Sequence, residues 1–171
     1  GDVDRDGFAE ILVGAPFADF TGAQAGSAYV IDLNNIGTPP RCYEFGKACP
    51  GSNGKLPHIG YRGRPALNET LEITLRGALP NAPVVINLGQ VANLPLDPYG
   101  FTNCTLYATN DGFVVVRQAD PLGLLNFDPL VVPNAPVFIG QSIFAQWICL
   151  DPLANPAGYA FSNAMEFAFG N

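Results

Sequence analysis

The sequence predicts an all-β protein: an antiparallel, jelly-roll-like β-sandwich preceded by a single incomplete β-hairpin with an acidic loop. Short segments alternate apolar and polar residues, as in ETLEITLRG, where Leu71, Ile73 and Leu75 would share one face. Turn-forming residues interrupt the chain throughout, with 19 Gly and 16 Pro. No segment of about ten or more residues has a helical period, so we expect few helices.

Five further segments have the β-branched and aromatic composition of strands. Asn110, Asp111 and Gly112 stand between two of them and predict a hairpin turn, because Asp and Gly tolerate a positive φ. Residues 45–65 are rich in Gly and Pro and predict a long loop that carries four of the eight basic residues. The five strand segments are residues 82–89, 104–109, 112–118, 142–151 and 164–170.

The composition divides the chain into two parts joined by a linker at residues 34–41. Residues 1–33 hold the acidic loop and two predicted strands, at 9–13 and 27–33. About 33 residues are too few to bury a self-sufficient core. Residues 42–171 hold all four cysteines and enough apolar residues for one disulfide-bonded sandwich domain.

The chain is acidic, with a net charge of −7 and a pI near 4.4. Such a chain repels nucleic-acid phosphates and no Lys/Arg stripe offsets the repulsion, so we expect no nucleic-acid partner and favour divalent cations. No apolar run approaches the roughly 18 residues of a membrane span, so none is expected. No basic segment followed by an apolar one marks a secretion signal, and we therefore expect a mature or partial chain.

Four cysteines, Cys42, Cys49, Cys104 and Cys149, predict two disulfides. Their number is even, no CxxC pair is present and the chain has a single histidine, which argues against a zinc site. Disulfides form in oxidising compartments, so we expect a secreted or cell-surface protein. Spacing alone favours Cys42–Cys49 with Cys104–Cys149, but all three pairings stay open.

The first ten residues include four carboxylates, in the loop DVDRDGFAE. Oxygens at alternate positions of a tight turn, which Gly7 permits, can surround one hard cation, and carboxylates this close repel each other unless a cation binds them. Oxygen ligands in a flexible geometry favour Ca²⁺. An EF-hand is excluded, because Val13 occupies the position of its bidentate glutamate. The predicted ligands are the carboxylates of Asp2, Asp4, Asp6 and Glu10 and the main-chain carbonyl of Phe8.

The stretch GDVDRDGFAEILVGAPFAD, followed by GSAYVIDL, resembles the FG-GAP repeat of integrin-α-type β-propellers over residues 1–33. The resemblance implies that the loop joins two strands of a propeller blade and binds Ca²⁺ through the same five residues, with Glu10 standing where Asp is more usual. A single repeat cannot bury its faces alone. We therefore expect it to be completed by the rest of the chain, by propeller sequence upstream, or by another copy of the protein.

The pattern FGKACPGSNGKLP, LPLDPYGFTNCTLY, VPNAPVFIGQSIFAQWICLDP and SNAMEFAFG lies within residues 43–170. It resembles a C-terminal β domain of secreted bacterial proteins. The resemblance implies a domain that often follows propeller-type repeats and has no enzymatic role. It also implies the disulfide Cys49–Cys104, and therefore Cys42–Cys149.

Candidates for catalysis are weak. His58 is the only histidine and no motif such as GxSxG accompanies it, so we expect an exposed loop residue. Trp147 and Tyr99 could stack on sugars, but Trp147 lies in an apolar strand and is expected in the core. Two sequons, at Asn68 and Asn103, would matter only in a eukaryotic secretory pathway. Paired-carboxylate chemistry would use two of five aspartates, most of them beside Pro or Gly as turn residues are: Asp97, Asp111, Asp120, Asp128 and Asp151.

These features favour a non-catalytic extracellular structural protein that is stabilised by Ca²⁺ and associates with copies of itself into a filament or surface assembly. An N-terminal segment that adds a strand to a neighbouring copy, or docks on it, would satisfy backbone groups of both. The alternative is a carbohydrate- or protein-binding module appended to a larger secreted propeller adhesin. A hydrolase is a distant third.

Overall fold

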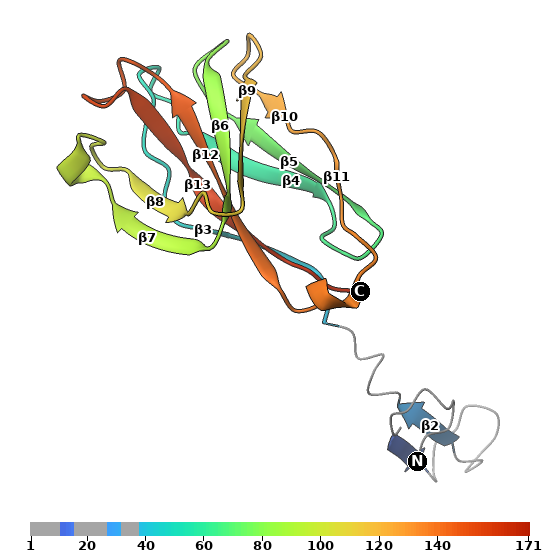
Figure 1. The fold of residues 1–171 in the computed structure, drawn as a ribbon. Coiled ribbons are helices and arrows are strands. Elements are labelled where there is room, and N and C mark those ends of the chain that lie inside the picture. The colour runs from blue at the N-terminus through green and yellow to red at the C-terminus, as the bar shows by residue number, and fades with distance from the viewer. Residues whose placement is uncertain (1–10, 16–26, 32–37) are drawn as a thin grey trace. The chain divides into compact units, whose positions relative to one another are not determined.

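The structure is a computed structural model that describes residues 11–15, 27–31 and 38–171 (Figure 1). The chain divides into two compact units, residues 1–37 and 38–171. The regular elements of the described residues are thirteen strands and two short 3₁₀ helices, so the predicted all-β class is confirmed. Among these residues, no helix has the length and apolar character needed to cross a bilayer.

The described residues of the first unit form one two-stranded antiparallel sheet. Strand β1 (Ile11–Ala15) pairs with β2 (Ser27–Ile31) along their full lengths. Both strands overlap the segments in which the sequence predicts them, residues 9–13 and 27–33. The predicted calcium ligands lie outside the described residues.

The second unit is built on a five-stranded antiparallel sheet with the strand order β3-β13-β12-β6-β9 (Figure 1). Its central strands β12 and β13 pair along nearly their whole lengths. The β12 sequence SIFAQWICL has no charged residue, as expected for a strand covered on both faces. The bounds are Arg41–Phe45 for β3, Pro83–Gly89 for β6, Phe113–Gln118 for β9, Ser142–Leu150 for β12 and Tyr159–Ala168 for β13.

A smaller antiparallel sheet forms the second layer of the sandwich. Its middle strand, β5 (Thr70–Arg76), pairs with β4 (His58–Gly63) on one side. Two strands of two residues each, β10 (Leu125–Asn126) and β11 (Leu130–Val131), pair with successive parts of β5 on the other side. The expected antiparallel sandwich is therefore present in residues 38–171.

The hydrophobic core lies between these two sheets. The alternation predicted in β5 is confirmed, because Leu71, Ile73 and Leu75 are each at most 2% exposed. Trp147 of β12 is buried as predicted, and its indole N–H donates to the carbonyl of Thr74 at 3.1 Å. The larger remaining members of the core are Ile59, Val84, Ile86, Leu88, Phe127, Met165 and Phe167.

A two-stranded ribbon, β7 (Val91–Pro95) with β8 (Thr105–Ala108), covers part of the other face of the five-stranded sheet (Figure 1). Short helix η1 (Asp97–Tyr99) lies in the connection between the two strands. A second, smaller apolar cluster fills the space beneath the ribbon. It contains Cys49, Leu96, Cys104 and Phe161, with Phe101, Leu106 and Ile148 packed against them.

Gln146 of β12 connects the ribbon to the five-stranded sheet. Its side chain is completely buried, and its amide group makes three hydrogen bonds. Its Oε1 accepts from the N–H of Tyr107 at 2.8 Å, while its Nε2 donates to the carbonyls of Thr105 at 3.0 Å and Ser162 at 2.8 Å. The N–H of Tyr107 and the carbonyl of Thr105 are backbone groups of β8. The glutamine amide therefore takes the place that the backbone of a paired strand would have beside β8.

An irregularity in the β12–β13 ladder makes this arrangement possible. Gln146 lies opposite Ala164 and Ile148 opposite Phe161, so β13 has one extra residue at this point. The hydroxyl of Ser162 accepts from the N–H of Trp147 at 2.9 Å, in place of a backbone carbonyl. The Ser162 carbonyl is thereby left for Gln146.

Two local predictions are wrong. The turn at residues 110–112 does not close a hairpin, because β8 pairs with β7 and β9 pairs with β6. Instead it carries the chain from the ribbon to the edge of the five-stranded sheet. The predicted loop at residues 45–65 contains β4, whose Gly60 and Gly63 weaken the strand pattern in the sequence although Ile59 faces the core.

We predict that Gln146→Leu destabilises the second unit by about 2–4 kcal/mol, because buried groups of Tyr107, Thr105 and Ser162 lose their partner while the volume is nearly kept. Urea unfolding followed by Trp147 fluorescence measures this change. Gln118→Leu is the matched control, since Gln118 is exposed and makes one side-chain bond, to the carbonyl of Asn81. Equal effects of the two substitutions would contradict the role assigned to Gln146.

Candidate functional site

The predicted calcium loop lies in the first unit. Asp2, Asp4, Asp6, Phe8 and Glu10 are all outside the described residues. Within the described ranges no group of three or more His, Cys, Asp or Glu side chains is arranged to hold a metal ion. The loop remains a prediction from its donor set, four carboxylates and one carbonyl, which is the ligand chemistry that Ca²⁺ prefers.

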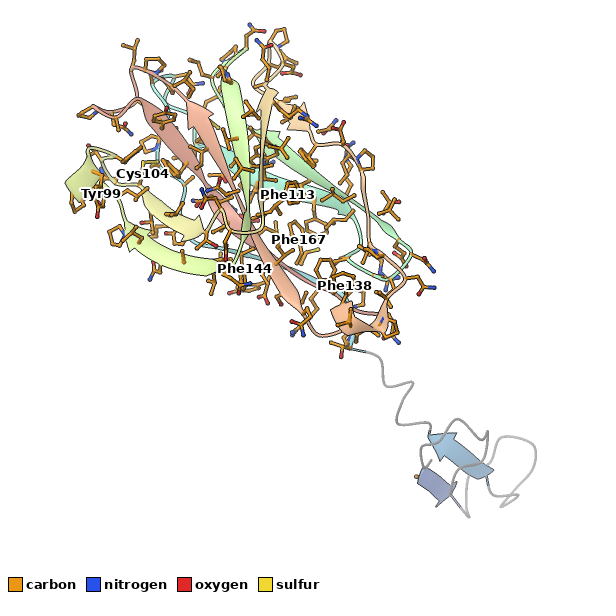
Figure 2. All side chains as sticks on the ribbon, viewed as in Figure 1. Tyr99, Cys104, Phe113, Phe138, Phe144 and Phe167 are labelled. Carbon is orange, nitrogen blue, oxygen red and sulfur yellow. A yellow bond between two sulfur atoms is a disulfide. The ribbon has the colours of Figure 1, made fainter. Side chains whose placement is uncertain are left out.

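One disulfide is present in the second unit, between Cys49 and Cys104. It joins the segment before β4 to the residue that precedes β8, Cys104, which Figure 2 labels. This is the bridge implied by the resemblance to secreted bacterial domains, and it excludes the pairing that spacing favours. The bridge and the hydrogen bonds of Gln146 both hold the ribbon against the sheet.

The second predicted disulfide, Cys42–Cys149, is not formed, and both residues are free thiols. The register of the sheet gives the reason. Cys42 of β3 lies opposite Phe167 of β13, whereas Cys149 of β12 lies opposite Ala160. Seven residues of extended strand place the two thiols roughly 23 Å apart along the sheet, far beyond the reach of a disulfide.

Both free thiols are held in the protonated form. Burial raises the pKa of Cys42 to about 11, an effect that a hydrogen bond with Tyr61 partly opposes. Burial and the nearby Asp151 carboxylate raise the pKa of Cys149 to about 12. A thiol nucleophile needs a lowered pKa, so neither residue has the environment of a reactive cysteine.

His58 lies on the outer strand β4, where its Nε2 is 2.8 Å from the Oε1 of Glu44 on β3. The pair borders a groove of about 300 Å³, whose lining also includes Tyr61, Thr74 and Arg76. Neither serine nor cysteine lines this groove. The geometry matches a polar contact between the edge strands of the two sheets, and His58 lies on a strand instead of the predicted loop.

The five candidate aspartates are spread over the fold and bind local partners. Oδ1 of Asp97 accepts from the N–H of Asn103, and Oδ1 of Asp120 accepts from the N–H groups of Leu122 and Leu124. Such bonds are typical of turn residues, as predicted. Asp128 pairs with Arg117, Asp151 accepts from the N–H of Ser52, and Asp111 accepts from the N–H of Gln90.

A cleft of about 530 Å³ lies where four connections meet at one end of the sandwich. The lining residues come from the corner after β6, the turn before β9, the segment from η2 (Pro136–Phe138) to the start of β12, and the residue after β13. These segments are far apart in the sequence, and no spacing pattern links them. The side chains used below are Gln90, Asp111, Phe138, Gln141, Ser142 and Phe169.

The Asp111 carboxylate is fixed at the rim of this cleft. Its Oδ1 accepts from the Thr109 hydroxyl and from the N–H of Gln90 at 3.2 Å. These bonds, that of Thr109 first, hold the pKa of Asp111 below its ordinary value, so the carboxylate is ionised at neutral pH. Gly89 permits this approach, since a side chain there would collide with the Asp111 carboxylate and the Thr109 hydroxyl.

Two phenylalanines supply the apolar part of the cleft. Phe138 of η2 and Phe169 after β13 pack edge to face, with ring centroids 6.0 Å apart. Both rings are half-buried. Figure 2 shows Phe138 near the C-terminal end of the chain, away from Tyr99 on η1. Tyr99 is 65% exposed and does not line the cleft.

Comparison with protein-family models matches the FG-GAP repeat to residues 1–31. The matched residues contain all five predicted calcium ligands and both strands of the first unit. FG-GAP repeats are typical of extracellular, adhesion-type modules and often bind calcium. No curated protein and no solved structure matches the chain. The resemblance of residues 43–170 to a secreted bacterial domain finds no support in these comparisons.

We predict that alkylation distinguishes one disulfide from two. Unfolded without reductant, the chain should take up two iodoacetamide groups, at Cys42 and Cys149, as counted by mass spectrometry. In the native protein Cys149 should stay unlabelled, while labelling of Cys42 should be slow at pH 8 and rise about tenfold per pH unit towards its pKa near 11. An unreduced, unfolded chain without any label would contradict the single disulfide.

Proposed function

We propose that the chain is a non-catalytic extracellular structural module, stabilised by Ca²⁺, that associates with copies of itself through its N-terminal segment. The observation that carries the proposal is that, among the described residues, β1 and β2 pair only with each other. A lone hairpin is marginally stable in water, and a unit of 37 residues cannot bury an adequate core. Contact with other protein would supply the missing strands or surface.

Calcium is the cation that the acidic loop fits best. Four carboxylates within nine residues repel one another without a cation. A bound Ca²⁺ would offset half of their charge and tie the loop to the start of β1. The family match to residues 1–31 supports this assignment, since repeats of this family often bind calcium. The ion would contribute folding free energy to the first unit.

The free edge of β9 is the best acceptor for a strand from a second copy. Ala119 donates its N–H to the carbonyl of Ala82 at 2.9 Å. In an antiparallel ladder every second residue of a strand bonds its partner strand, so this bond shows which residues of β9 bond β6. The backbone groups of Val115 therefore point to β6, and those of Val114 and Val116 point away. Among the described residues, β9 has no strand partner on that side.

The side chains of β9 also suit a partner strand. Val114 and Val116 are 45% and 61% exposed on the outer face. Exposed edge strands are usually protected by charged residues, as β3 is by Arg41 and Glu44. The one charged side chain of β9, Arg117, is paired with Asp128, so the exposed Val114 and Val116 leave an apolar stretch. This stretch favours addition of an apolar strand such as ILVGA of β1 from a neighbouring copy.

The remaining parts of the proposal rest on the sites already described. The Cys49–Cys104 disulfide and the family match support an extracellular location. His58 pairs with Glu44, and the five candidate aspartates are engaged by nearby backbone groups, by the Thr109 hydroxyl or by Arg117. These arrangements support a structural role in preference to hydrolysis.

We predict that chelation with EDTA lowers the melting temperature of the first unit and breaks up assemblies formed in 1 mM Ca²⁺. Saturating calcium at about 100 times its Kd is worth about 2.7 kcal/mol. Asp4→Ala should remove most of the calcium response, whereas Asp19→Ala, an acidic residue outside the predicted ligand set, should retain it. Calorimetry measures the melting temperature, and light scattering after size-exclusion chromatography measures the size of the assemblies. A compact monomer whose melting temperature does not change with calcium would overturn the proposal.

A second prediction concerns the acceptor edge. Val116→Lys places a charge on the exposed face of β9 and should lower the assembled fraction at least fivefold at equal protein concentration, because a lysine opposes strand addition. Leu153→Lys is the matched control, since Leu153 is 85% exposed and lies in the connection between β12 and β13, which are not edge strands. Sedimentation velocity in calcium gives the fractions. Equal assembly by the two variants would exclude β9 as the acceptor.

A further inference from the structure

We propose that the cleft beside Asp111 is a binding site for a neutral carbohydrate. This inference goes beyond the proposed function and does not depend on it, because every lining residue belongs to the second unit. The cleft volume of about 530 Å³ lies in the usual range for small-ligand sites. Connections that gather at one end of a sandwich are a common place for such sites.

The charge of the lining excludes an acidic ligand. None of the residues that line the cleft is Lys, Arg or His, so no cation is available to bind a phosphate, sulfate or carboxylate group. Asp111 is the single charged residue, and it repels anions. The site therefore fits a neutral or positively charged molecule.

The free oxygen of Asp111 suits a hydroxyl donor. Oδ1 is engaged by Thr109 and Gln90, whereas Oδ2 has no hydrogen-bond partner among the described residues. An ionised carboxylate accepts stronger hydrogen bonds than a neutral group does. Because its partners already fix the carboxylate, a ligand would not have to order it on binding.

The other polar groups favour a molecule with several hydroxyls over a simple amine. The side-chain amides of Gln90 and Gln141 are exposed, and each offers donors and an acceptor. The Ser142 hydroxyl donates to Oε1 of Glu166 at 2.7 Å, so its lone pairs remain to accept. An amine would use only the carboxylate, whereas neighbouring sugar hydroxyls can use donors and acceptors together.

The aromatic pair supplies the second requirement of a sugar site. A pyranose ring has a polar rim and an apolar face of C–H groups. Phe138 and Phe169 present half-buried aromatic surface in the same cleft as the polar groups. The combination of a fixed carboxylate, two amides and an aromatic surface, without a cation, is what points to a neutral sugar.

The test uses the full chain on an array of immobilised neutral, amine-bearing and acidic oligosaccharides. Calorimetric titration with the neutral oligosaccharide bound best then gives its Kd. Asp111→Asn keeps an Oδ1 acceptor for Thr109 and Gln90 but removes the charge, and it should weaken binding at least tenfold. Phe138→Ala should weaken it by a similar factor. The controls Asp128→Asn and Tyr43→Ala, at exposed residues outside the cleft, should bind within twofold of the native chain.

Three results would overturn the inference. The first is no binding of any neutral oligosaccharide at millimolar concentration. The second is binding restricted to amine-bearing or acidic sugars. The third is unchanged affinity in both cleft variants, with native melting temperatures showing that they are folded. A loss of affinity in the cleft variants alone supports the site.

Discussion

The second unit depends on how the two faces of its five-stranded sheet are covered. One face packs on the β4–β5 sheet through an apolar core. The other face is covered by the β7–β8 ribbon, which is hydrogen-bonded to the buried side-chain amide of Gln146. The extra residue in β13 frees the Ser162 carbonyl, and Gln146 bonds it together with two backbone groups of β8. One buried polar side chain thus joins the ribbon to the five-stranded sheet. Its burial is tolerated because its donors and acceptor are satisfied.

The same covering creates the cleft. Because β8 leaves the sheet face before the chain returns as β9, the turn around Asp111 lies beside the corner after β6 and not at the end of a hairpin. The start of β12 and the end of β13 meet at this end of the sandwich, which brings Phe138 and Phe169 together. The two proposed roles therefore use different surfaces: the edge of β9 for self-association, and the end of the sandwich for ligand binding.

Local pattern predicted what depends on local physics. Alternation identified β5 and its buried face, and the apolar run around Trp147 identified a strand with the tryptophan in the core. Which strands pair with each other could not be predicted in this way. The sequence of the turn at Asp111 is the same whether or not the two strands beside it pair with each other. Register likewise decides that Cys42 and Cys149 lie apart. The cleft gave no signal, since its residues are separated by up to 80 positions (Gly89 to Phe169) and meet only through the topology.

The single disulfide has a consequence for the resistance of the second unit to proteases. Cys49 and Cys104 are 55 positions apart, and the loop they close contains the exposed turn at residues 51–55 and the outer strand β4. A protease that nicks this loop once leaves both fragments covalently attached, with the sheets still paired. The two pieces of the cut protein separate only after a reductant opens the bridge.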